Sequence, residues 1–233
     1  MLFDVFQTIV DFDGDHITDE TWQFMSKWCR YRRVHIDPDE LHRRYRSSVD
    51  ALAAVAPGNP PDIDVLDCWE ELLGAPRHDA IAAEAALTFR QITTRSISQY
   101  PGTSAVLDAL NDLRLGIVSN TQRAYTESEL AMLDLAHRFE AVVFSSDVRA
   151  AKPDPAPFHR ALELMNAGPD DCVYVGDNPY DDVVGARRLG IPVVLIEREH
   201  PRLAEAGLPE PDARVVHDTP AEIVRAVRGL IDG

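Results

Sequence analysis

The stretch CVYVGDNPYDDVVGARRLGIPVVLI, residues 172–196, decides the fold of this chain. Two apolar runs rich in β-branched residues, Cys172–Gly176 and Ile191–Ile196, flank a helix-like segment, Pro179–Leu189. An apolar run without polar alternation is typical of a strand that is covered on both faces. A strand, a helix and a second strand in succession predict two parallel strands joined by a right-handed crossover.

The same alternation extends outward from this stretch over most of the chain after residue 100. Further strands are expected at Gly116–Ser119, Ala141–Phe144 and Arg214–His217. Further helices are expected at Thr103–Asp112, Gln122–Asp134, Pro155–Asn166 and Pro220–Ile231. The sequence therefore predicts an α/β fold with a Rossmann-like parallel sheet.

Residues 14–98 follow a different pattern. Apolar residues recur there with a spacing of about 3.6, which is typical of amphipathic helices. These helices are expected at Thr18–Arg33, Pro38–Ala56, Val65–Leu73 and His78–Ser96. We therefore expect an α/β core domain of residues 1–13 and 99–233, interrupted by an all-α domain of residues 14–98.

The composition limits the possible partners and compartments. The 233 residues carry a net charge of −16, which would repel nucleic acid and anionic membranes. The 3 cysteines are odd in number and form no C-x-x-C pair, which argues against a disulfide framework or a zinc site. The sequence contains no apolar run of the roughly 18 residues needed to span a membrane, and its start does not resemble a signal peptide. We expect a cytoplasmic protein.

Several polar residues follow the expected strands. In an open parallel sheet, ligands bind beyond the carboxyl ends of the strands. Asp4, Ser119 and Asp177 each follow an apolar run, and Lys152 lies in the loop after another. A carboxylate can act as a nucleophile through a covalent intermediate, whereas neighbouring carboxylates repel one another and favour a bound cation such as Mg²⁺.

The order of these residues resembles that of the haloacid dehalogenase (HAD) superfamily, whose members are mostly phosphatases. The resemblance is carried by Asp4-Val5-Phe6-Gln7-Thr8, Val118-Ser119-Asn120, Ala151-Lys152-Pro153-Asp154 and Gly176-Asp177 with Asp182. It implies a helical (C1-type) cap and a Mg²⁺-dependent phosphatase that acts on a small anionic metabolite through an aspartyl-phosphate at Asp4. A monomer or homodimer is expected.

The resemblance also implies a role for each site residue. The implied catalytic residues are Asp4, Thr8, Ser119, Lys152 and Asp182. The implied substrate contacts are Phe6, Ser119, Asn120 and Lys152. The implied Mg²⁺ ligands are Asp4, the backbone carbonyl of Phe6 and Asp177, with Asp182, or less favourably Asp181, in the outer shell.

One position departs from the phosphatase pattern. Phosphatases of the superfamily carry a second aspartate two residues after the nucleophile, which protonates the leaving group, but this chain has Phe6 there. Dehalogenases of the superfamily tolerate an aromatic residue because halide leaves without a proton. Those enzymes use no metal, however, and carry Ser and Asn in place of Asp177 and Pro179. A 2-haloacid dehalogenase and a weakly active or non-catalytic binding protein therefore stay open as alternatives.

A second choice of nucleophile also stays open. The stretch Asp11-Phe12-Asp13-Gly14-Asp15 resembles the phosphatase opening Asp-x-Asp-Gly-Thr, with Asp11 as nucleophile and Asp13 as acid–base. This choice replaces the expected threonine by an aspartate and places the helical insert only a few residues later. We favour Asp4, which keeps Thr8 and leaves room for a turn before the helices.

Overall fold

The computed structural model describes residues 1–77, 79–198, 207–215 and 219–232. Its centre is a parallel six-stranded sheet with the strand order β5-β4-β1-β6-β7-β8. The strands are β1 (Leu2–Phe3), β4 (Gly116–Ser119), β5 (Ala141–Phe144), β6 (Tyr174–Gly176), β7 (Val193–Ile196) and β8 (Ala213–Val215). The predicted α/β fold with a Rossmann-like parallel sheet is thus confirmed. The end of the last predicted strand, residues 216–217, lies outside the described residues.

Helices pack on both faces of this sheet. One apolar cluster joins the sheet to α5 (Thr103–Ala109), α6 (Arg123–Met132) and α10 (Pro220–Ile231). A second cluster joins the other face to α8 (Ala156–Met165) and α9 (Gly185–Arg188). None of the helices in the described ranges is both long enough and apolar enough to cross a lipid bilayer.

A small antiparallel sheet connects the two parts of the chain. It pairs β2 (Val10–Asp13) with β3 (Ser96–Gln99), so that Val10 lies opposite Gln99. The predicted helix His78–Ser96 is wrong at its end, because α4 (Ala80–Thr93) stops before β3 begins. The predicted boundary between residues 98 and 99 falls inside β3, and the division into two domains stays a prediction.

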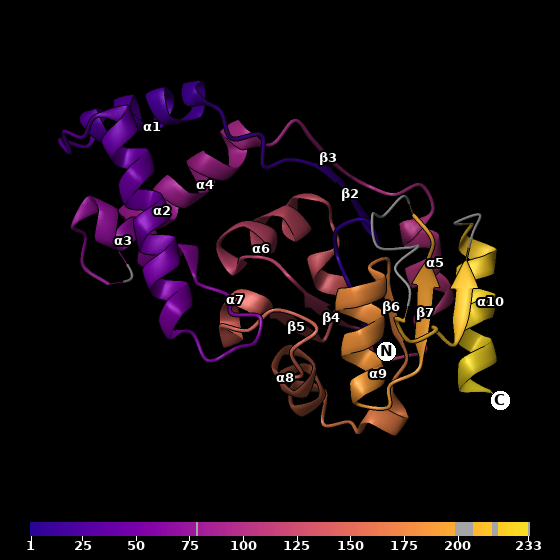
Figure 1. The fold of residues 1–233 in the computed structure, drawn as a ribbon. Coiled ribbons are helices and arrows are strands. Elements are labelled where there is room, and N and C mark those ends of the chain that lie inside the picture. Colours follow the sequence, from indigo (N-terminus) through magenta and orange to yellow (C-terminus); the bar gives the residue numbers. More distant parts are fainter. Residues whose placement is uncertain (78, 199–206, 216–218, 233) are drawn as a thin grey trace.

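The remaining helices form a cap with its own apolar cluster. Helices α1 (Asp19–Tyr31), α2 (Pro38–Val55), α3 (Val65–Leu73) and α4 gather on one side of the sheet (Figure 1). Trp22, Trp69 and Phe89 are buried among them. The side chains of Asp64 and Asp79 accept hydrogen bonds from Leu66 N (3.0 Å) and Ile81 N (2.9 Å), which satisfies backbone donors where α3 and α4 start.

The cap contacts the core through α4 and through the loop between α2 and α3. Helix α4 packs against α6. On the other flank, the loop between α2 and α3 pairs with the segment before Lys152, and Ala151 N donates to Pro60 O at 3.0 Å. A Cβ on Gly58 would overlap Ala150 and lie 2.8 Å from Arg149 O, so this close approach needs glycine. The cap is therefore docked on both flanks of the region above the sheet.

Candidate active site

Three central strands bring the predicted site residues together. Asp4 follows β1, Ser119 ends β4 and Asp177 follows β6, and these strands are neighbours in the sheet. Lys152 comes from the loop before α8. All four side chains are buried. The site therefore lies at the carboxyl edge of the sheet, as expected for an open parallel sheet.

The ammonium of Lys152 contacts two of the acidic side chains in the site. Its Nζ donates to Asp4 Oδ1 at 2.9 Å and to Asp182 Oδ1 at 2.6 Å. Burial of Lys152 disfavours its charged form, but the carboxylates of Asp182 and Asp4 outweigh burial and raise its pKa above the ordinary value. Lys152 thus carries a full positive charge between two carboxylates.

Three carboxylates face one another beside this lysine. Asp4, Asp177 and Asp182 each offer a ligand oxygen, and the three oxygens lie within 4.8 Å of one another. Burial, followed by the charges of Asp182 and Asp4, raises the pKa of Asp177 to about 8. Burial also raises the pKa of Asp4, an effect that Lys152 opposes and Asp182 reinforces. Three carboxyl groups at this spacing, which one ammonium cannot neutralise once all three are ionised, are chemically suited to a hard divalent cation.

Hydroxyl groups contact two of the carboxylates. Thr8 Oγ1 donates to Asp177 Oδ1 at 3.1 Å. A hydrogen bond from the Ser119 hydroxyl lowers the pKa of Asp4, against the larger effect of burial. Both contacts orient the acidic side chains.

The side chain of Asn120 holds the lysine loop. Its Nδ2 donates to Lys152 O at 3.0 Å, and its Oδ1 accepts from Lys152 N at 2.7 Å. The structure thus shows Asn120 positioning the backbone of Lys152. The contact between Asn120 and substrate stays a prediction.

A π-helical turn, Pro179–Val184, brings Asp182 back under the site. Asp182 Oδ2 accepts from Asn178 N at 2.9 Å, while Oδ1 faces Lys152. Asp181, the less favoured alternative, accepts from Asn178 Nδ2 at 2.8 Å. A Cβ on Gly176 would lie 2.5 Å from Asp182 Cγ, so only glycine lets the turn approach β6 this closely.

The alternative nucleophile lies elsewhere. Asp11 and Asp13 are exposed residues of β2. Asp4, by contrast, lies in the cluster with Lys152. The geometry favours the choice of Asp4.

The half-buried ring of Phe6 faces aromatic rings and a cap residue. Its ring centroid is 4.8 Å from that of Phe12. The guanidinium of Arg90, from α4, lies 3.9 Å from the Phe12 centroid and also covers Phe6. Arg90 Nε donates to Glu129 Oε1 at 2.7 Å, and Nη1 donates to Asp15 Oδ1 at 3.0 Å. Phe6 is therefore packed at the boundary between cap and core.

The hydroxyl of Tyr174 is a polar group of the site that was not predicted from the sequence. Tyr174 stands in the strand β6, and its Oη lies 2.7 Å from Lys152 Nζ. Burial is the main reason why its pKa is raised well above the ordinary value, so the phenol keeps its proton. The available signal was a tyrosine within a strand expected to be buried on both faces, because a buried phenol needs a hydrogen-bond partner.

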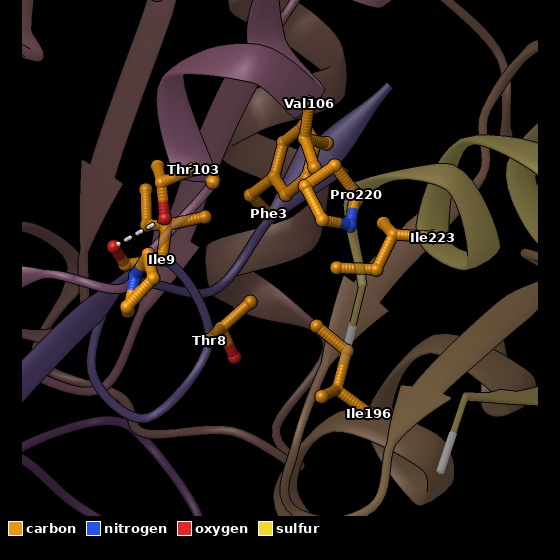
Figure 2. A pocket seen from close by; sticks show the side chains of 10 residues that line it. Phe3, Thr8, Ile9, Thr103, Val106, Ile196, Pro220 and Ile223 are labelled. Atoms are coloured by element: carbon orange, nitrogen blue, oxygen red, sulfur yellow. Dashed lines mark hydrogen bonds between the residues drawn. The ribbon is translucent and has the colours of Figure 1, made fainter. Parts of the chain in front are cut away.

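A small cavity lies behind the loop that follows Asp4. Figure 2 shows it between Thr8, Ile196 and Pro220. The Thr103 hydroxyl donates to Ile9 O at 3.0 Å along its wall. Its volume of about 20 Å³ is near that of one water molecule, so it is too small for a metabolite.

Comparisons with known proteins identify the family. The family model of the haloacid dehalogenase-like hydrolases matches residues 67–196. A phosphoserine phosphatase from Thermus thermophilus is 34% identical over 185 residues, which are 78% of this chain and 71% of that protein. A glyceraldehyde 3-phosphate phosphatase from Methanopyrus kandleri is 27% identical, covering 84% of this chain and 82% of that protein.

Solved structures show the same architecture. The HAD phosphatase from Thermococcus onnurineus has a TM-score of 0.57 and 25% identity, over 98% of this chain and 97% of that one. The L-2-haloacid dehalogenase from Xanthobacter autotrophicus has a TM-score of 0.59 and 19% identity over the same shares, which establishes the fold alone. Since the family model covers more than half of the sequence, and a relative is 34% identical over most of its own length, the resemblance is confirmed: this chain belongs to the haloacid dehalogenase-like hydrolases.

Proposed function

We propose that this chain is a Mg²⁺-dependent phosphatase that acts on a small phosphorylated metabolite through an aspartyl-phosphate at Asp4. The observation that carries the proposal is the buried carboxylate cluster of Asp4, Asp177 and Asp182 beside Lys152. A metal-independent dehalogenase does not need this accumulation of negative charge. The two relatives described above are named phosphatases, which supports the same choice.

Asp4 is the proposed nucleophile. Lys152 holds its Oδ1 at 2.9 Å, and Ser119 donates a hydrogen bond to the same carboxylate. These contacts orient Asp4 for attack on phosphorus, so that a bond to Asp4 forms as the bond to the leaving oxygen breaks. Water then cleaves the aspartyl-phosphate. The charge of Lys152 stabilises the negative charge that gathers around phosphorus.

The proposed metal ligands are Asp4, the backbone carbonyl of Phe6 and Asp177, with Asp182 in the outer shell. Mg²⁺ at this place would supply charge neutralisation between the carboxylates and the substrate phosphate. Thr8 would brace Asp177 through the hydrogen bond between them. A cytoplasmic location and a monomeric or homodimeric state are further predictions.

Phe6 is the observation that favours a second candidate, a 2-haloacid dehalogenase that forms an ester at Asp4. The phenyl ring has no proton to give to a leaving oxygen, and halide needs none. A positioned acid is typically worth about 10²–10⁴ in rate, so a phosphatase that relied on Phe6 alone would be slow on poor leaving groups.

The test measures hydrolysis of p-nitrophenyl phosphate and of 2-chloropropionate, each with Mg²⁺ and with EDTA. We expect phosphate release that requires Mg²⁺. Chloride release that continues in EDTA would replace the proposal by the dehalogenase. Inactivity on both, followed by inactivity on a panel of metabolite phosphates, would favour the ligand- or partner-binding alternative.

Two matched variants test the nucleophile. Asp4→Asn should abolish activity because the amide cannot form the covalent intermediate. Asp11→Asn changes an exposed aspartate of β2 and should leave activity unchanged. The reverse result would identify Asp11 as the nucleophile and overturn the choice of Asp4.

A further inference from the structure

The hydroxyl of Tyr174 contacts three groups at the floor of the site. The side chain is fully buried. Its Oη lies 2.7 Å from Lys152 Nζ, 2.8 Å from Val118 O and 3.0 Å from Asp182 Oδ1. Val118 and Tyr174 belong to β4 and β6, the strands on either side of β1. The hydroxyl thus connects the two strands that flank the strand of the nucleophile.

Counting protons assigns a direction to each of these hydrogen bonds. Within the part of the chain that the structure describes, Lys152 Nζ has four oxygen neighbours: Asp182 Oδ1 at 2.6 Å, Tyr174 Oη at 2.7 Å, Asp4 Oδ1 at 2.9 Å and Val118 O at 3.1 Å. An ammonium has three protons to donate. The three shortest distances therefore direct them to Asp182, Tyr174 and Asp4.

The proton of Tyr174 then has to go to another acceptor. Because its oxygen accepts from Lys152, the hydroxyl donates to Val118 O or to Asp182 Oδ1. Val118 O is the nearer of the two, at 2.8 Å against 3.0 Å. Asp182 Oδ1 also already accepts from Lys152. The arrangement with Tyr174 donating to Val118 O gives each of the four shortest contacts one proton, and leaves the contacts at 3.0 Å and 3.1 Å without one.

We propose that Tyr174 is a positioning residue that directs Lys152 toward Asp4 by occupying the carbonyl of Val118. Without the hydroxyl, the Lys152 proton that was directed to Tyr174 turns to Val118 O, which is already 3.1 Å away. The ammonium then moves away from Asp4 and toward β4. This inference rests on the proposed function, in which Lys152 orients and neutralises Asp4.

The main test is Tyr174→Phe, which removes the oxygen and keeps the ring. We expect kcat to fall about tenfold, the size expected for one hydrogen bond to a charged group, with KM changed less than twofold. A purely structural defect would lower the thermal midpoint and the yield of active enzyme instead of the kcat of the folded enzyme. Unchanged kcat in an active, folded variant would overturn the proposal.

Tyr45→Phe is the matched control. Tyr45 lies in the cap, where its ring packs against Trp69 and Phe89. The variant therefore also lacks a phenol oxygen, but in an aromatic cluster away from Lys152. We expect its kcat to equal that of the wild type. An equal loss of kcat in both variants would show that any lost tyrosine hydroxyl has this effect, and would also overturn the proposal.

Two structure determinations test the role of Tyr174 without a measurement of enzyme activity. In a crystal structure of Tyr174→Phe, Lys152 Nζ should lie closer to Val118 O than the present 3.1 Å and farther from Asp4 Oδ1 than the present 2.9 Å. An unmoved ammonium contradicts the proposal. If the variant does not fold, a neutron structure of the wild type serves: a Tyr174 deuteron directed at Val118 O supports the assignment, and one directed at Asp182 overturns it. A wild type that hydrolyses no phosphate ester would refute the proposed function separately.

Discussion

The guanidinium of Arg90 lies 5.4 Å from the centroid of the Phe6 ring, so a residue of the cap covers the side chain that stands two positions after Asp4, the proposed nucleophile. Arg90 is 7% exposed, and its ion pair with Glu129 joins α4 of the cap to α6 of the core. The aromatic ring at position 6 thus has a packing role: its face accommodates a cation, as in other cation–π pairs. This contact also decides how a carboxylate at position 6 would behave.

We predict that Phe6→Asp raises turnover of an aliphatic phosphate monoester, because the new carboxyl can protonate the leaving oxygen. The positive charge of Arg90 nearby will hold the pKa of that carboxyl low, so the acid form is scarce at neutral pH. The gain should therefore be larger at pH 5.5 than at pH 7.5. Steady-state rates at both pH values, beside Phe6→Asn as the variant without an acid, check this.

No gain in a folded Phe6→Asp enzyme would mean that another group already serves as the acid or that phosphate is the wrong substrate. An equal gain in Phe6→Asn would mean that removing the ring, and not adding an acid, changes the rate.

Most of the sheet could be predicted because the strands β4 to β7 are almost wholly buried. The strands from Gly116–Ser119 to Val193–Ile196 are mainly apolar runs, with Ser119 at the end of the first and Asp177 directly after Tyr174–Gly176. The pair β2 and β3 gives no such signal, since Val10–Asp13 contains two aspartates and Ser96–Gln99 two serines. These two segments form strands because they pair with each other, although they lie far apart in the sequence.

The candidate site also contains residues that could be predicted from the sequence and contacts that could not. Asp4, Ser119 and Asp177 could be placed from sequence because the chain topology alone carries strand ends to one edge of a sheet. The covering of Phe6 by Arg90 and the contact of Tyr174 with Lys152 depend on side-chain directions after packing. A single sequence without relatives contains no pattern that pairs those residues.

We predict that Arg90→Met strongly destabilises the protein. The side chains of Arg90 and Glu129 are 8% and 13% exposed, and the loss of Arg90 removes the cation from the largely buried carboxylate of Glu129. Breaking a buried ion pair in this way typically costs about 3–5 kcal/mol in the free energy of unfolding. Urea unfolding measures the change, and Glu129→Met added to Arg90→Met should restore part of the stability.

The control for this prediction is Arg114→Met. Arg114 pairs with Glu140, and their side chains are 54% and 47% exposed, so its loss should change the free energy of unfolding far less than the loss of Arg90 does. Equal losses for both arginines, or a double variant no better than Arg90→Met, would contradict the assignment of Arg90 as a buried link between cap and core.

The acidic cluster predicts a pH dependence of stability in the metal-free protein. Burial and the charges of Asp182 and Asp4 raise the pKa of Asp177 from 3.8 to about 8. The unfolded chain loses this proton near 3.8 and the folded protein keeps it to about 8, so the free energy of unfolding falls as the pH rises between these values. In EDTA, the thermal midpoint of the wild type should drop more from pH 5.5 to pH 8.5 than that of Asp177→Asn.

Magnesium should reverse part of this trend. A metal binds the deprotonated carboxylates, so added Mg²⁺ should raise the thermal midpoint more at pH 8.5 than at pH 5.5. A wild type and an Asp177→Asn variant with parallel pH profiles would show that Asp177 does not carry the effect. Equal stabilisation of both proteins by Mg²⁺ would place the ion elsewhere.

We predict that Gly176→Ala lowers kcat at least tenfold, although it adds only one methyl group. The new Cβ would lie 2.5 Å from Asp182 Cγ and 2.9 Å from Asp182 Cβ, so Asp182 must move away from β6 and from Lys152. Gly229→Ala is the matched control: it lies in α10, a Cβ there meets nothing within 4 Å, and alanine should stabilise this helix by up to about 1 kcal/mol. Steady-state kinetics and thermal unfolding of both variants separate the two effects. An active Gly176→Ala enzyme would show that the turn from Pro179 to Val184 can shift without disturbing Lys152, and that the close approach of Asp182 to β6 is not needed for catalysis.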